Sequence, residues 1–253
     1  MRTTTKIKTI TVAAVALIAL AITSFSTLPG LQEAQPPPAA STPAAEPASP
    51  PTAVEVSASP YADTAALAAV LPLVVDESEI PAYVRASFGP AWADVDGNGC
   101  RQRDDVLARD LVDVEMASNR CTVLRGVLEV DPYTGKRITF QHDRVAEPGN
   151  PGSQGVQGEH IISLKAAHVG GAWSWSDEQR LKFANDLDNV IAVDGIANQS
   201  KQDSGPADWL PLTIYRCTYV TKYAQIAAEW GLAVSAADRD ALVTTLNECA
   251  VSE

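Results

Sequence analysis

The chain has 253 residues, a formal net charge of −12 and a pI of about 4.7. A dedicated nucleic-acid-binding module is usually basic, so this charge balance argues against one. Removing the N-terminal segments described next leaves roughly 190 residues, which is near the size of one domain and enough to bury a sizeable core.

The first 26 residues have the pattern of a secretory signal peptide. A basic start precedes the apolar run 9–22, and small residues follow at a plausible cleavage site. An uncleaved signal anchor is the alternative. Residues 27–60 are rich in Pro and Ala, cannot bury a core and therefore predict an extended linker. We expect a secreted protein with no stable membrane association after cleavage, whose folded domain spans 61–253.

Residues 94–105 resemble the start of a calcium-binding loop. Asp94, Asp96 and Asn98 supply oxygens at alternate positions, and Asp105 stands at the closing position. Arg101 occupies a place that is usually apolar, and the closing residue is Asp instead of a bidentate Glu. An Asx-rich turn before a helix is the alternative interpretation, so Ca²⁺ is a candidate cofactor of this loop.

The number of cysteines is even, and they lie behind a signal peptide, which indicates disulfide bonds. A zinc site is the alternative, but the chain has no CxxC motif and only three histidines. Three pairings are open to four cysteines. They are Cys100, Cys121, Cys217 and Cys249.

Local geometry favours one of these pairings. Helices are predicted at 218–230 and 236–249 with a short loop between them, so they should fold back antiparallel. That arrangement brings Cys217 and Cys249 together. The other two cysteines flank a predicted helix at about 103–112 that leads into a strand, and we expect them to form the second bond.

Two further elements are predicted before the central stretch is reached. Residues 121–141 predict a β-hairpin around the turn 131–136. The insert 165–187 predicts a helix that begins at Ser176, with Gln179 at the capping-box position. We expect the two tryptophans of this insert to pack in the core, with base stacking as the alternative.

The most informative stretch follows. The apolar runs after His160 and after Asn189 predict two short strands. Asp194 can N-cap a short helix that carries Asn198 and Lys201 three residues apart, on neighbouring positions of one face. Strand, strand and helix would each deliver polar groups to a common point.

These polar groups suit hydrolysis of a phosphodiester. His160 can take a proton from water near neutral pH. Glu159 and Asn198 can hold a hard divalent cation, and Lys201 can meet a phosphate as a point charge. Asn189 can hold the imidazole in the useful tautomer, by its side chain or its backbone.

Two other histidines compete for the role of base. His142 has no neighbours with metal-ligand spacing, and His168 lies in the insert, where we expect it to line the site or the surface.

The motifs also resemble a known family, the HNH endonucleases, also called ββα-metal or His-Me finger endonucleases. The usual form of that family is Asp-His-Ile-Val-Pro, then Asp-Asn-Leu, then Asn-x-x-Lys. The resemblance is strongest to the branch found in secreted bacterial proteins, where a Trp-containing insert precedes the middle Asn. The corresponding segments here are Glu159-His160-Ile161-Ile162-Ser163, Asp188-Asn189-Val190 and Asn198-Gln199-Ser200-Lys201.

The resemblance implies an α+β fold with a ββα-metal core, to which helices and a β-hairpin are added. It implies that His160 is the general base, that Asn189 orients it and that Glu159 and Asn198 are metal ligands. Glu159 departs from the usual Asp and is one methylene longer, so the metal would sit differently or be reached through water.

Two hypotheses result. The first is an exported endonuclease that acts on DNA, with RNA as a further candidate substrate, and that uses a single Mg²⁺ or Mn²⁺ chosen by oxygen ligands. Binding would be non-sequence-specific and salt-sensitive, and would rely on local cations such as Arg180, Lys182 and Lys201. The second is a non-catalytic exported binding module on the same scaffold, either wall-associated or calcium-dependent.

Overall fold

The computed structural model describes residues 59–74 and 76–252. The predicted signal peptide and nearly all of the predicted linker lie outside these residues. Within the described ranges, no helix has the length and apolar character needed to cross a membrane.

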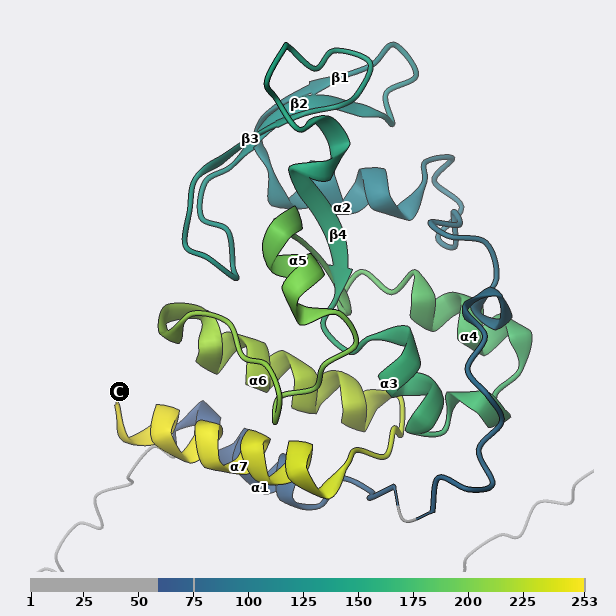
Figure 1. The fold of residues 1–253 in the computed structure, drawn as a ribbon, viewed down its shortest axis with the longest axis vertical. Helices are drawn as coiled ribbons and strands as arrows, with labels where there is room; N and C mark the ends of the chain where they lie inside the picture. Colours follow the sequence, from purple (N-terminus) through teal and green to yellow (C-terminus); the bar gives the residue numbers. More distant parts are fainter. Residues whose placement is uncertain (1–58, 75, 253) are drawn as a thin grey trace, which may run out of the picture. The chain divides into compact units, whose positions relative to one another are not determined.

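Short helices and small sheets alternate along the chain (Figure 1). The helices are α1 (Pro60–Ala69), α2 (Gln102–Asp110), α3 (Leu164–Val169), α4 (Asp177–Ala184), α5 (Gly195–Lys201), α6 (Thr213–Glu229) and α7 (Ala236–Val251). The 3₁₀ turns are η1 (Arg85–Phe88), η2 (Gly152–Gln154) and η3 (Ala172–Ser174). The strands are β1 (Val112–Met116), β2 (Val123–Leu128), β3 (Ile138–Gln141), β4 (Val156–His160) and β5 (Val190–Asp194).

The strands form two antiparallel sheets, one ordered β1-β2-β3 and the other made of β4 and β5. The hairpin predicted at 121–141 is confirmed as β2 and β3, and β1 adds a third strand. In Figure 1 the three-stranded sheet lies at one end of the described domain and α1, α6 and α7 lie at the other, with β4 and α5 between them. The coarse prediction of an α+β domain is therefore confirmed.

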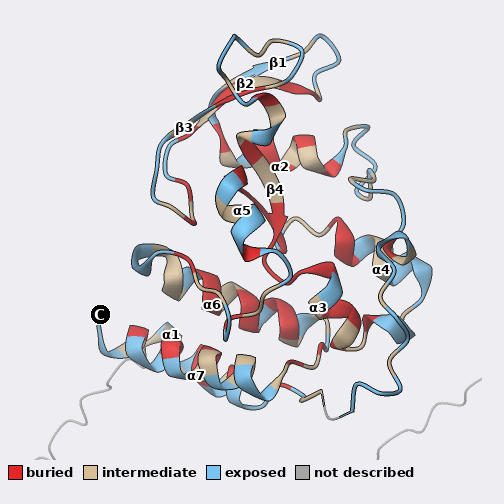
Figure 2. Cartoon of the chain, viewed as in Figure 1, coloured by how far each residue is buried: buried red, intermediate tan, exposed pale blue. Residues whose placement is uncertain are grey.

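Strand β5 is buried on both faces, because its side chains alternate between two apolar clusters. Ile191 and Val193 belong to the larger cluster, which includes the helices α1, α6 and α7. Val190 and Ala192 belong to the smaller cluster, which lies against α2 and the three-stranded sheet. Figure 2 shows buried residues along β4 and over much of α6. The β4–β5 pair thus lies between the two cores.

The strand predicted after His160 is wrong in position. Strand β4 ends at His160, and its five pairs with β5 run from Val156↔Asp194 to His160↔Val190. The two isoleucines that follow are buried, but they leave the strand and enter the turn before α3. The apolar run therefore reflects the burial of a turn and not a strand.

The strand after Asn189 and the helix capped by Asp194 are both confirmed. The Asp194 carboxylate accepts the backbone N–H groups of Ile196 (2.7 Å) and Ala197 (2.9 Å) at the start of α5. These are two of the donors that a helix N-terminus leaves without an internal partner. The hairpin turn also holds this point, because Asp131 accepts the N–H of Asp194 at 2.8 Å.

In the insert, the predicted capping box of α4 is confirmed between Ser176 and Gln179. The tryptophans differ from each other. Trp175 packs against Phe183 and Trp230, as expected of a core residue, whereas Trp173 is 42% exposed.

Both predicted disulfides are confirmed, as Cys100–Cys121 and Cys217–Cys249. The second bond joins the antiparallel helices α6 and α7, although α6 begins five residues earlier than expected and contains Cys217. Ser235 caps α7, and Gly231 after α6 adopts a φ of 62°, which a residue with a side chain rarely adopts.

We expect the double substitution Cys217→Ser and Cys249→Ser to lower the free energy of unfolding by about 3–4 kcal/mol. The reason is that the bond closes a loop spanning 32 residues and so restricts the unfolded chain. Urea unfolding of the oxidised parent and the variant measures this change. An unfolding midpoint equal to that of the parent would contradict it.

Candidate active site

His160 is held by two groups at the end of β4. Its Nε2 lies 2.8 Å from the carbonyl oxygen of Ala184, and the indole ring of Trp92 stacks on it with centroids 6.0 Å apart and an interplanar angle of 14°. A carbonyl can only accept, so Nε2 carries the hydrogen and Nδ1 keeps its lone pair. The geometry therefore selects the tautomer in which Nδ1 is the basic atom.

The charge state of His160 agrees with this role. Burial lowers the pKa of the imidazole to about 4, and the positive charges of Arg85 and Lys201 act in the same direction. The hydrogen bond to Ala184 opposes them. The ring is consequently neutral near neutral pH, and it can accept a proton.

Asn189 acts on the backbone that follows His160. It is fully buried, its Oδ1 accepts the N–H of Ile162 at 2.9 Å, and its Nδ2 donates to the carbonyl of Ile162 at 3.2 Å. Its own carbonyl accepts the N–H of Ile161 at 2.8 Å. The predicted contact with the imidazole is made by the Ala184 carbonyl instead, so Asn189 fixes where His160 stands and not which tautomer it adopts.

Glu159 and Lys201 form a buried ion pair. Lys201 is fully buried, and its Nζ donates to Glu159 Oε1 at 2.7 Å and to the carbonyl of His160 at 3.0 Å. Burial raises the pKa of Glu159, and the Lys201 charge opposes the rise. In this arrangement Lys201 does not present a point charge to solvent. The phosphate contact predicted for it is therefore not available without breaking the pair.

Asn198 lies next to this pair, on the same side of β4. It is half-buried, and its Nδ2 donates to Oε1 of Gln157 at 2.8 Å. Gln157 and Glu159 are two positions apart on β4 and point to one face, whereas His160 points to the other. The contacts agree with this, because Glu159 meets α5 and His160 meets Trp92. The base and the predicted ligands therefore approach the end of β4 from opposite faces.

The donor chemistry at α5 fits a divalent cation. Glu159 offers a carboxylate and Asn198 an amide oxygen, and Mg²⁺ is commonly held by one or two such protein ligands while it keeps several waters. Within the part of the chain that the structure describes, no group of three or more His, Cys, Asp or Glu residues is suited to a closed metal site. The residues fit a loosely held cation that shares Glu159 with Lys201.

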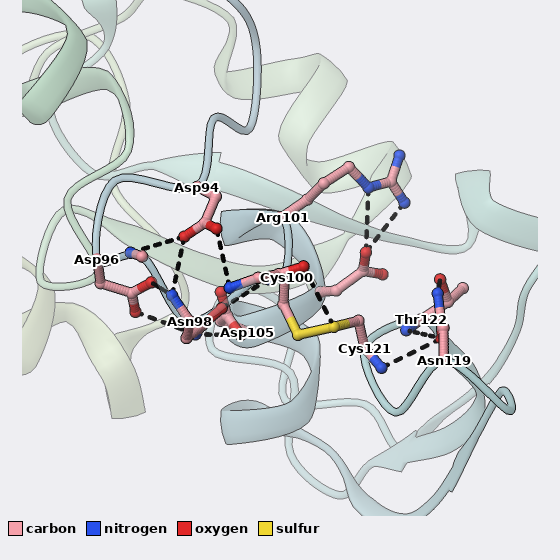
Figure 3. The surroundings of a disulfide bond; sticks show 12 residues. Asp94, Asp96, Asn98, Cys100, Arg101, Asp105, Asn119, Cys121 and Thr122 are labelled. Atoms are coloured by element: carbon pink, nitrogen blue, oxygen red, sulfur yellow. Dashed lines mark hydrogen bonds and ion pairs between the residues drawn. A yellow bond between two sulfur atoms is a disulfide. The ribbon is translucent and has the colours of Figure 1, made fainter.

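The loop 94–105 turns its acidic groups toward its own backbone (Figure 3). Asp94 accepts the N–H groups of Gly97 (2.8 Å) and Gly99 (2.9 Å). Asn98 Nδ2 donates to Asp96 (3.1 Å) and Asp105 (3.2 Å). This arrangement favours the Asx-turn interpretation, and calcium binding by these residues stays a prediction.

The other residues considered from sequence have structural partners. His142 Nδ1 accepts the N–H of Arg144 at 3.1 Å, and His168 is buried with Nε2 2.7 Å from the carbonyl of Pro81. His168 therefore packs inside the domain and does not line the site of His160. Arg180 bonds the carbonyl of Ser87 at 2.8 Å, and Lys182 is paired with Glu178 at 2.8 Å, so neither is a free local cation.

Sequence reasoning missed two parts of the site, Trp92 and the Ala184 carbonyl. A main-chain oxygen leaves no signal in the residue type. Trp92 precedes His160 by 68 residues, so no local spacing connects the two. Two features distinguish Trp92: its φ is 59°, and the residue that faces its ring, at position 158, is a glycine. The first is a backbone conformation, which the sequence does not show, and the second is a residue type.

The fold and this set of groups define a disulfide-stabilised α+β domain of nuclease-like type. The model of the family described as "GmrSD restriction endonucleases, C-terminal domain" matches residues 101–245, and the chain belongs to this family. This confirms the family resemblance that the sequence motifs predicted. An uncharacterized secreted protein of the fungus Arthroderma benhamiae is 35% identical over 170 residues, which cover 66% of this chain and 76% of that protein. No solved structure matches the chain.

We expect Asn189→Ala to lower the free energy of unfolding by roughly 2–4 kcal/mol, because it leaves the buried N–H and carbonyl of Ile162 without partners. Asn198→Ala is the matched control, since it removes one half-buried hydrogen bond and should cost about 1 kcal/mol or less. Chemical unfolding of both variants tests the difference. Equal losses of stability would show that the hydrogen bonds of Asn189 to the backbone of Ile162 are not the important ones.

We also expect Lys201→Met to destabilise the domain by about 3–5 kcal/mol, because it leaves the Glu159 carboxylate buried without its cation. Adding Glu159→Gln removes the unpaired charge, so the double variant should recover much of the loss. Urea midpoints of the parent, the single variants and the double variant form a double-mutant cycle. Additive losses would contradict the buried pair.

Proposed function

We propose that the chain is an exported, metal-dependent endonuclease of the HNH type, with a ββα-metal core formed by β4, β5 and α5, that hydrolyses phosphodiester bonds of DNA. The single observation that carries the proposal is the hydrogen bond of His160 Nε2 to the Ala184 carbonyl, which leaves Nδ1 as a base. The family match supports it, since the matched range contains all three motifs. Export is supported by the predicted signal peptide and by the fungal relative, whose name describes it as secreted.

In the proposed reaction, His160 Nδ1 takes a proton from a water molecule as the water oxygen attacks phosphorus. The bond from phosphorus to the 3′ oxygen breaks, and that oxygen leaves in line with the incoming one and gains a proton from solvent. Glu159 and Asn198 would hold the metal. A bound Mg²⁺ or Mn²⁺ supplies Lewis-acid stabilisation of charge on the phosphate and the leaving oxygen. Asn189 contributes by keeping the end of β4 in place.

A non-catalytic binding module is the second candidate. The observation that favours it is the Glu159–Lys201 ion pair, which already gives the carboxylate a cation from the protein. A metal held by Glu159 must compete with that lysine or share the carboxylate with it. Plasmid cleavage with Mg²⁺ or Mn²⁺, and its loss in EDTA, separates the two candidates.

We expect His160→Ala to reduce plasmid nicking by about 10²-fold or more, the usual scale for removal of a positioned base. Asn198→Ala should instead weaken metal binding, so excess Mg²⁺ should restore part of its activity. Nicking rates measured against metal concentration for both variants give the comparison.

The control is His142→Ala, which should cut like the parent because its ring lies outside the site. His168→Ala is unsuitable as a control, since the ring is buried and its loss should affect stability. Cutting by His160→Ala at the parent rate would overturn the assignment of the base. A parent protein that cuts plasmid with neither Mg²⁺ nor Mn²⁺ would favour the binding module only if it still binds nucleic acid, so the binding measurements below complete the test.

A further inference from the structure

Trp92 forms the wall between two neighbouring cavities. It lies outside the matched residues 101–245, so the family model does not account for it. On one side is a cavity of about 30 Å³ lined by Arg85, His160 and Ala184. On the other is a wider, open cavity of about 330 Å³, lined by Arg103, Ser153, Gln154, Gln157 and Gly158.

The ring of Trp92 is fitted closely to β4. A Cβ added to Gly158 would lie 2.9 Å from Trp92 Cη2, so a glycine is required where the indole approaches the strand. Trp92 has a φ of 59°, a conformation that side-chain-bearing residues seldom adopt and that costs energy unless the surroundings hold it. Packing of the core alone does not require an indole in this unfavourable backbone conformation beside a candidate base.

Each cavity has one arginine, and neither arginine is used in an ion pair. Among the described residues, the arginines in salt bridges are Arg101, Arg109, Arg125, Arg137 and Arg180. Arg85 is exposed at the first turn of η1. Arg103 lies over the ring of Phe140 at 5.9 Å and donates to the carbonyl of Ser153 at 3.4 Å. In a chain of net charge −12, these two guanidinium groups lie on either side of an indole without a salt bridge, and the charges of Asp104 and Asp143 act on Arg103 from beyond salt-bridge distance.

We propose that Arg85 and Arg103 bind successive phosphates of a single nucleic-acid strand, and that Trp92 stacks on the base between them. The inference rests on the proposed function and specifies the substrate subsite of the same site. Guanidinium groups recognise phosphate oxygens, and an indole stacks on any base without sequence preference. The smaller cavity has room for a water molecule or one phosphate oxygen beside the imidazole. The larger cavity is of the size of small-ligand pockets, and the amides of Gln154 and Gln157 can meet a base edge.

The test is binding of a short fluorescein-labelled single-stranded DNA in EDTA, measured by anisotropy over a range of salt concentrations. Arg85→Ala and Arg103→Ala should each reduce the slope of log K against log salt by about 0.7, and the double variant by about 1.4. Arg137→Ala is the matched control, because it removes the same charge from an exposed arginine, with 57% of its side chain accessible, that lines neither cavity.

Trp92 should behave differently from the arginines. Trp92→Ala should weaken binding by about 10-fold at every salt concentration and leave the slope unchanged, because stacking releases no counterions. Trp92→Phe keeps an aromatic face and should bind nearly as well as the parent. Arg103→Gln replaces Arg103→Ala if melting curves show that loss of the stem over Phe140 unfolds the domain.

The outcomes separate this inference from the proposed function. Slopes for Arg85→Ala and Arg103→Ala equal to that of Arg137→Ala, or unweakened binding by Trp92→Ala, overturn the subsite even if the parent cuts plasmid. A parent that binds with the expected slopes but never cuts with Mg²⁺ or Mn²⁺ overturns the nuclease and leaves the subsite. A parent that does not bind the strand overturns the subsite. A single-stranded RNA of the same sequence, measured in parallel, shows which sugar the subsite prefers.

Discussion

The pairing of β4 with β5 is the constraint on which the rest of the domain depends. Five residue pairs hold the two strands, and Asn189 continues the contact beyond the last pair by bonding both polar groups of Ile162. These are buried backbone groups that must find partners, since leaving them without any costs more than the hydrogen bond itself gains. Because the register is fixed, the pleat decides that His160 faces Trp92 and that Glu159 faces α5. A slip of one residue would exchange these two faces.

Helix α5 is fixed to this pair at both ends. At its start, the Asp194 carboxylate caps two backbone N–H groups, and Asp131 from the hairpin accepts the N–H of Asp194. At its end, the Lys201 ammonium reaches back to Glu159 and to the carbonyl of His160. A helix of seven residues has little stability of its own, so these contacts and its packing hold it. The lysine therefore links the two faces of β4, since it pairs with the acid on one face and bonds the backbone of the residue whose ring lies on the other.

Local signals in the sequence were sufficient for those parts of the fold whose cause is local. The cap at Asp194, the capping box of Ser176 and Gln179 and the turn of the hairpin involve residues a few positions apart, and all were predicted. The disulfides were also predicted, because a short loop between two helices of similar length determines which cysteines meet. The site depended on contacts between distant residues. Burial of Lys201, the Ala184 carbonyl at His160 and the indole of Trp92 arise from packing across 24 to 68 residues, and no periodicity or spacing encodes them.

The acidic composition and a nucleic-acid substrate are compatible because charge acts locally. Over distances longer than about 10 Å, exposed charges are largely screened at moderate salt, so the net charge of −12 is felt less at a cleft than the groups that line it.

Several cations of the described domain are already neutralised by carboxylates, including Lys182 and Lys201. The same ion pairs neutralise their carboxylates locally, and the Asp94 carboxylate accepts hydrogen bonds from backbone N–H groups. In the proposed subsite, a phosphate at the end of β4 meets Arg85 and Arg103, which form no salt bridge within the described residues. For the proposed nuclease, attraction of this kind would make binding strongly dependent on salt.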